Sequence, residues 1–374
     1  MKHNHLLVIA VLFSLSLTSC LEQKEELPSL ESQLPGITPG TPGSPPSNPP
    51  VTGGCDSTAS TLADAGYYIP PGREMIPLCD GDILLQDPTD NTLGLINVGT
   101  QQVKNVWQLT ATPSHMVMDE ARKYVYIALV GASKVARIDV SAATNTVDYI
   151  STSAPASWLA LGESGFLFAN LSSQYWGNVD LLDLTALSRV HTFTGSYYKM
   201  MVYNKSRKEL IMSAPGLSPA SLYRYSFDPN ANTLTQVEYV FDNGSNANYM
   251  AISPDFQKFA LSAGAGNSSG YVLFDYNPAS LTATNGTYNV GAYPKGAAFT
   301  PDSNFFVTTN ASDKVKIFNT TTHALVREYT LNTSVCSYAT IETVKFSAGG
   351  KTVYVNLTCG FNDDSGILLA FKFQ

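Results

Sequence analysis

The sequence predicts an all-β protein, a seven-bladed β-propeller with four antiparallel strands per blade, and three observations support this fold class. An apolar residue followed by a polar turn and two short β runs recurs at Met118, Leu161, Tyr203, Ile252, Phe299 and Phe346. Successive copies lie between 42 and 49 residues apart. Their apolar residues alternate or form β-branched and aromatic blocks, which is typical of strands and not of helices. A four-stranded unit of this length buries its faces only against its neighbours, as a propeller blade does.

The most regular copies are Ala298–Asn310 with Lys314–Asn319, and Ala251–Asp255. They resemble the YVTN family of bacterial seven-bladed propellers, whose repeat has a Ser-Pro-Asp-Gly-like turn, a Tyr-Val-Thr-Asn-like strand and a Val-x-Val-Ile-Asp-like strand. The resemblance covers residues 113–374 and implies a fold more than a function. Three turns depart from the pattern, at 119–121, 204–206 and 347–350, and are assigned by period and strand pattern.

The first and last blades are predicted from the segments that flank the six copies of the repeat. Residues 74–78, 82–86, 93–98 and 103–109 read as the four strands of the first blade. The last copy ends with a third strand at 366–374, so we expect residues near 65–69 to supply its fourth strand and close the ring. Such closure removes an exposed sheet edge. If the early segment were a separate cap, the count would fall to six and a half blades.

The N-terminus is typical of a bacterial lipoprotein. Lys2, the apolar run 6–17 and the sequence Leu17-Thr18-Ser19-Cys20 predict a signal peptide over residues 1–19 and a lipid on Cys20. The run is shorter than the roughly 20 residues that span a bilayer. By resemblance to Gram-negative lipoproteins, Leu21 after the cysteine favours the outer membrane. The protein could face either the periplasm or the cell surface.

Residues 20–54 are expected to form a tether and residues 55–374 a single propeller domain. The segment from Leu21 to Gly54 is rich in Pro, Gly and Ser and cannot bury a core. It would reach about 30 Å as a coil and about 100 Å as polyproline II. A proline-rich ligand for another protein is the alternative interpretation of this segment.

Four cysteines remain after Cys20, and an even number in an exported chain predicts two disulfides. Three pairings are possible, and sequence proximity favours Cys55 with Cys79 and Cys336 with Cys359. Both pairs would fasten the ends of the ring. A metal site is disfavoured, because no second thiolate lies at ligand spacing and no histidine is near.

Composition limits the partners. Only 14% of residues are charged, against about 25% in average proteins, and the chain is acidic overall with a net charge of −8. We therefore expect no nucleic acid partner. We also expect no cofactor and a monomer attached to the membrane through its lipid.

In lactonase-like relatives of the YVTN family, ligands meet the loops that enter the innermost strands. The residues three or four positions before the recurring apolar residues include His115, Trp158, Lys199, Tyr249, Lys295 and Glu342. The two lysines could bind an anion, and each of the six could also be a packed or exposed loop residue. A second set of loops offers exposed aromatics at Tyr175 and Trp176, and paired acids at Asp363 and Asp364. Calcium at these acids or at 87–91 is disfavoured by their spacing.

Motifs for chemistry are absent from the sequence. His115, His191 and His323 lie in separate repeats, and there is no haem, phosphate-loop or nucleophile-elbow signature. We therefore expect a non-enzymatic binding module for a protein, peptide or glycan. The alternatives are a lactonase-like hydrolase and a scaffold for outer-membrane protein assembly.

Overall fold

The computed structural model describes residues 65–373 apart from short gaps, and residues 1–64 lie outside this part. The gaps are 70–73, 101, 143, 164, 172–175, 215–218, 241–246, 248, 263–270, 277–280, 289, 292–293, 311–313, 332–338 and 360–364. The chain divides into two units, residues 1–37 and 38–374, and every described residue belongs to the second.

The described residues form seven four-stranded antiparallel sheets in a propeller-like fold. The first sheet contains β2 (Met75–Pro77), β3 (Asp82–Asp87), β4 (Thr92–Asn97) and β5 (Gln102–Gln108). The second contains β6 (Thr112–Met118), β7 (Tyr124–Val130), β8 (Lys134–Asp139) and β9 (Asp148–Ser151). The third contains β10 (Trp158–Leu161), β11 (Phe166–Asn170), β12 (Trp176–Asp183) and β13 (Ser188–Tyr198). The fourth contains β14 (Met200–Asn204), β15 (Glu209–Ser213), β16 (Leu222–Asp228) and β17 (Thr233–Val240).

The remaining three sheets follow the same plan. The fifth contains β18 (Met250–Ile252), β19 (Lys258–Leu261), β20 (Tyr271–Tyr276) and β21 (Leu281–Tyr288). The sixth contains β22 (Lys295–Phe299), β23 (Phe305–Thr309), β24 (Lys314–Asn319) and β25 (Leu325–Thr330). The seventh contains β26 (Ala339–Phe346), β27 (Thr352–Cys359), β28 (Ser365–Lys372) and β1 (Ala65–Ile69). A short 3-10 turn, η3 (Cys79–Gly81), precedes β3.

β1 pairs antiparallel with β28, with Tyr67 opposite Leu368. The strand order of this sheet is β1-β28-β27-β26, whereas the other six sheets follow chain order. The prediction that residues 65–69 supply the last strand is therefore confirmed.

Each innermost strand is followed by a turn with one residue in the left-handed region of backbone space. These residues are Gly81, Arg122, Gly165, Lys208, Phe256, Ser303 and Gly350. Side chains hold the turn where it is best formed: the Asp302 carboxylate accepts hydrogen bonds from Thr300 Oγ1 at 2.6 Å and from Asn304 N at 3.0 Å. Asp119 accepts from the Tyr124 amide at 2.9 Å, five residues on, as Thr300 Oγ1 accepts from the Phe305 amide at 3.0 Å. The irregular copies thus keep the left-handed residue of the turn although their amino-acid sequences differ.

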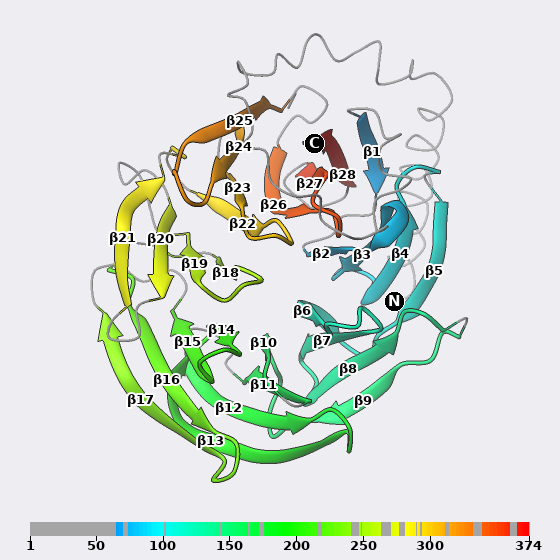
Figure 1. Ribbon diagram of the computed structural model, residues 1–374. Coiled ribbons are helices and arrows are strands. Elements are labelled where there is room, and N and C mark those ends of the chain that lie inside the picture. The colour runs from blue at the N-terminus through cyan, green and yellow to red at the C-terminus, as the bar shows by residue number, and fades with distance from the viewer. Residues whose placement is uncertain are drawn as a thin grey trace, which may run out of the picture. The chain divides into compact units, whose positions relative to one another are not determined.

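The innermost strands contact one another in the cyclic order β2, β6, β10, β14, β18, β22, β26 and back to β2. Figure 1 shows these strands around the middle, with the fourth strands of the sheets on the outside. This arrangement brings the start of every innermost strand to the same region.

The core lies between neighbouring sheets. Leu84 and Trp107 of the first sheet pack with Met116 and Ile127 of the second. The first sheet also packs against the seventh, where Met75 shares a buried cluster with Tyr354. Burial between sheets explains why strands such as β7 and β23 are almost entirely buried.

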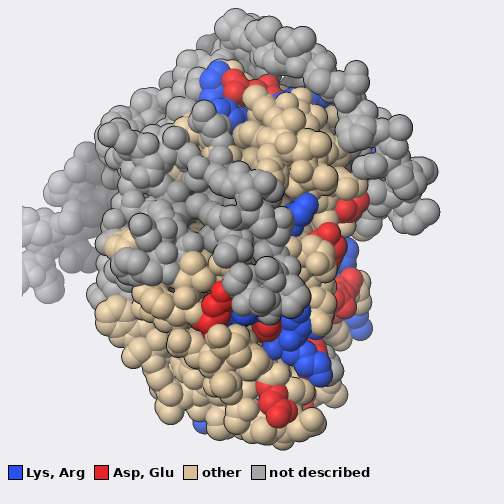
Figure 2. Space-filling model, turned by 60° about the vertical axis from the view of Figure 1, so that its left-hand side comes forward, with Lys and Arg blue, Asp and Glu red and all other residues tan. Residues whose placement is uncertain are grey.

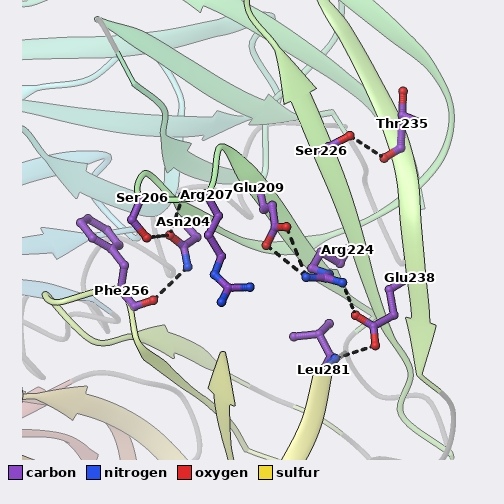
Figure 3. Close-up of polar contacts among 10 residues, drawn as sticks. All are labelled: Asn204, Ser206, Arg207, Glu209, Arg224, Ser226, Thr235, Glu238, Phe256 and Leu281. Carbon is purple, nitrogen blue, oxygen red and sulfur yellow. Dashed lines mark hydrogen bonds and ion pairs between the residues drawn. The ribbon is translucent and has the colours of Figure 1, made fainter. Parts of the chain in front are cut away.

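A buried ion pair of the fourth sheet includes a carboxylate that also bonds to the fifth sheet. Arg224 on β16 is 4% exposed and contacts Glu209 at 3.2 Å and Glu238 at 2.7 Å. Glu238 Oε1 also accepts a hydrogen bond from the amide of Leu281, at the start of β21 (Figure 3). The Glu238 side chain thus holds two adjacent sheets together.

The surface carries few charges. Figure 2 shows one face on which acidic and basic side chains lie beside one another among many uncharged residues. Within the described part, no helix is long and apolar enough to cross a membrane.

Candidate functional site

Four polar and aromatic residues occupy equivalent positions on different sheets. Each stands three residues before the last residue of an innermost strand, and the four are Glu74, His115, Trp158 and Tyr249. Because the innermost strands contact in a cycle, equal register places these side chains at one level, where the strands begin. Glu74, His115, Trp158, Tyr249 and Lys345 are called the entry cluster below.

Glu74 is the buried carboxylate of the entry cluster. It is 7% exposed, and its Oε2 accepts a hydrogen bond from the backbone amide of Met116 at 2.8 Å. The Tyr249 hydroxyl lies near enough to influence its pKa. Burial raises the pKa of Glu74 to about 7, although Lys345, the Met116 amide and Tyr249 each oppose that rise. Near neutral pH this carboxyl therefore exchanges between its charged and neutral forms.

His115 is a neutral hydrogen-bond donor. Its Nδ1 accepts from the Leu159 amide at 3.2 Å, so the proton of the neutral ring lies on Nε2. Burial lowers the pKa of His115 well below its usual value, and the charges of Lys345 and Lys199 lower it further. Nε2 lies 3.7 Å from Glu74 Oε1, which is longer than a hydrogen bond, and a neutral imidazole forms no ion pair.

Trp158 joins the aromatic side chains of the entry cluster. Its ring stacks on His115 with centroids 4.0 Å apart and meets Tyr249 edge-on at 6.2 Å. The indole Nε1 donates to the Met201 carbonyl on the next sheet at 2.9 Å. Both ends of this partly buried side chain are thereby fixed.

Lys345 reaches the entry cluster from the seventh sheet. Its ammonium donates a hydrogen bond to the Tyr249 hydroxyl and lies 4.9 Å from the centroid of that ring. Burial alone lowers the pKa of Lys345, but Tyr249 and Glu74 outweigh burial and raise it. Lys345 therefore stays charged while Glu74 changes its charge.

Two cavities adjoin the entry cluster. One of about 250 Å³ begins at His115 and Trp158 and is lined further on by apolar side chains, among them Val117, Met201 and Ile252. The other, of about 590 Å³, includes Lys345. Both share Val117, Leu161 and Ile252 in their walls, so they are neighbours along the innermost strands.

Two further lysines that the sequence singled out stand at the same end of the innermost strands. Lys199 immediately precedes β14 and Lys295 begins β22, and both are partly buried. Burial lowers the pKa of Lys199. Among the described carboxylates, none lies within ion-pair distance of the Lys199 ammonium.

The structure thus brings three of the predicted site residues together in the entry cluster, namely His115, Trp158 and Tyr249. The other predicted site residues are not part of this cluster. Trp176 is 54% exposed at the start of β12. Tyr175, Asp363 and Asp364 lie outside the described residues, as does the side chain of Glu342, whose backbone belongs to β26. Cys79 is disulfide-bonded, but Cys55, Cys336 and the Cys359 side chain are not described, so the pairing stays a prediction.

Glu74 and Lys345 were not among the site residues predicted from the sequence. Glu74 stands three residues before Pro77, the position that His115 has before Met118, so extending the register to the first sheet would have found it. Lys345 stands one residue before the end of β26, and its long side chain carries the charge back to the entry cluster. Among the described residues, no group of three or more His, Cys, Asp or Glu is placed to hold a metal ion.

Comparison with known proteins supports the fold alone. No family model matches the chain, and no curated protein sequence is significantly similar to it. Among solved structures, hydrazine synthase of Kuenenia stuttgartiensis superposes with a TM-score of 0.61 at 14% identity, covering 82% of this chain and 96% of that chain. A functionally unknown protein of Desulfotomaculum acetoxidans gives 0.60 at 9% identity, covering 76% and 90%. At such identities the likeness carries no activity to this chain.

Proposed function

We propose that this chain is a non-enzymatic binding module, a seven-bladed propeller of the YVTN kind held at the outer membrane by a lipid on Cys20. Its ligand is a protein, peptide or glycan, which meets the end of the channel where the innermost strands begin. The lipid anchor and tether are supported by the sequence 17–20 and by the composition of residues 21–54.

The observation that carries the binding role is the convergence of the entry cluster. Side chains from the first, second, third, fifth and seventh sheets meet there, beside cavities of about 250 and 590 Å³. A concave site with aromatic walls and a few polar groups is the usual form of a ligand site.

The contacts of His115 disfavour nucleophilic catalysis. The adjacent Ser114 hydroxyl donates to the Ser157 carbonyl at 3.0 Å, and His115 Nδ1 is already occupied by the Leu159 amide. A histidine that activates a serine must accept its proton, and here the other ring nitrogen carries one. A binding role needs no such acceptor.

The test is to screen the purified protein against glycan and peptide arrays and to compare variants. Because aromatic anchors dominate interfaces, Trp158→Ala should weaken binding of the best ligand by about tenfold or more. The matched control is Leu325→Ala, which truncates a 47% exposed apolar side chain on β25 and should leave affinity unchanged. An array without a ligand, or equal affinity in the Trp158→Ala variant, would contradict the proposal.

A further inference from the structure

The cavity of about 250 Å³ is amphipathic along its length. His115 and Trp158 stand at the entry end, and Val117, Leu161, Met201, Met250 and Ile252 line the middle. Glu120 and Lys205 line the opposite end, in the turns that follow β6 and β14, and they pair at 2.6 Å. A ligand that fits this cavity needs an apolar body.

The entry end offers positive charge and unused hydrogen-bond donors. Lys199 is partly buried and pairs with none of the described carboxylates, although its charge acts on His115. His115 Nε2 carries a proton and has no acceptor within hydrogen-bond distance in the described part of the chain. Because His115 lines the cavity, this N–H is available to an acceptor that a ligand supplies.

Thr343 adds an independent observation. Its hydroxyl is buried, with 2% of the residue exposed, and has no protein partner. Thr343 and Lys345 are two residues apart on β26 and therefore lie on one face of the strand. Thr343 also stands three residues before Phe346, at the level of Glu74 and His115.

We propose that the entry end of the channel binds the carboxylate of a small organic acid whose apolar body lies in the cavity of about 250 Å³. The carboxylate accepts from His115 Nε2 and pairs with Lys199, with Lys345 and the Thr343 hydroxyl nearby. This site goes beyond the proposed binding of a protein, peptide or glycan at the channel mouth, and either site can exist without the other.

Glu74 tunes such a site by its charge. The titratable groups that face Glu74 are His115, Tyr249 and Lys345, from the second, fifth and seventh sheets. His115 is neutral and Lys345 stays charged through neutral pH, so Glu74 is the group in this set whose charge changes. The anionic ligand is repelled by ionised Glu74 and binds more tightly once that carboxyl is protonated.

The experiment is calorimetric titration of the purified protein with phenylacetate, with its uncharged amide as a matched probe and a protein-free titration as the blank. Phenylacetate should bind and the amide should bind at least about tenfold more weakly, because a charged hydrogen bond is lost. Lys199→Met, which keeps the aliphatic stem, should cause a similar loss. Lys134→Met, at an exposed lysine on β8, should cause none.

The pH series completes the test. Affinity for phenylacetate should rise several-fold between pH 8 and pH 6 in the wild type and stay flat in Glu74→Gln. Equal binding of acid and amide, unchanged affinity in Lys199→Met, or no binding at all would overturn the inference. Array binding that depends on Trp158 would survive each of these outcomes, so the two proposals fail separately.

Discussion

At the scale of single residues, Glu74 is the side chain whose chemistry depends most on the fold. Burial raises its pKa from 4.5 to about 7, so the native state holds this proton across a range in which the unfolded chain has lost it. Between these values the native state binds more protons, and stability falls as pH rises. The full difference is about 3 kcal/mol, which is present above pH 7 as a destabilisation.

Glu74→Gln should therefore stabilise the protein at pH 8 by up to about 3 kcal/mol and leave it nearly unchanged at pH 4.5. Chemical denaturation of wild type and variant from pH 4 to 8 measures this difference. The lowered pKa of His115 has the opposite effect, with stability lost as pH falls below 6.5, but it is present in both proteins and largely cancels. A difference that does not grow between pH 4.5 and 7 would show that Glu74 titrates normally.

At the scale of elements, the repeat predicts the sheets well because strand pairing follows from local patterns. The expected strand at 82–86 is β3, and the expected closing strand at 65–69 is β1. Trp158 and Tyr249 could be assigned to one level because their spacing to Leu161 and Ile252 is the same.

Contacts between sheets could not be predicted in this way. The Glu74 bond to the Met116 amide joins residues on different sheets, as does the Lys345 bond to Tyr249. The residue pattern of one strand does not indicate which side chains of a neighbouring sheet that strand contacts. The perturbed groups of the entry cluster are therefore properties of the assembled fold.

Glu238, which pairs with Arg224 in the fourth sheet and accepts from the Leu281 amide of the fifth, gives a prediction at this scale. Glu238→Ala should cost about 3 kcal/mol of unfolding free energy, because it leaves Arg224 buried with a single carboxylate and removes the acceptor of the Leu281 amide (Figure 3). Glu120→Ala breaks the pair with Lys205, in which Glu120 is 74% exposed, and should cost less than about 1 kcal/mol. Equal losses in the two variants, measured by urea denaturation, would contradict an interlocking role for Glu238.

At the scale of the whole molecule, the two ends of the described chain meet in one sheet, where β1 pairs with β28. That pairing covers the edge of β28. This closure is consistent with the seven-bladed ring, the lipid anchor and the binding role that we propose. A binding domain held on a tether needs a stable fold. The entry cluster is the point at which five of the sheets contribute to one site.

The most direct test of this account follows the three tryptophan indole N–H signals by NMR while the best array ligand is added. Trp158 lies in the entry cluster, Trp107 is fully buried in the first sheet, and Trp176 is exposed on the third. We predict that the Trp158 signal shifts in proportion to occupancy and that the Trp107 signal does not move. Saturating ligand that leaves Trp158 unmoved would contradict binding at the channel entry.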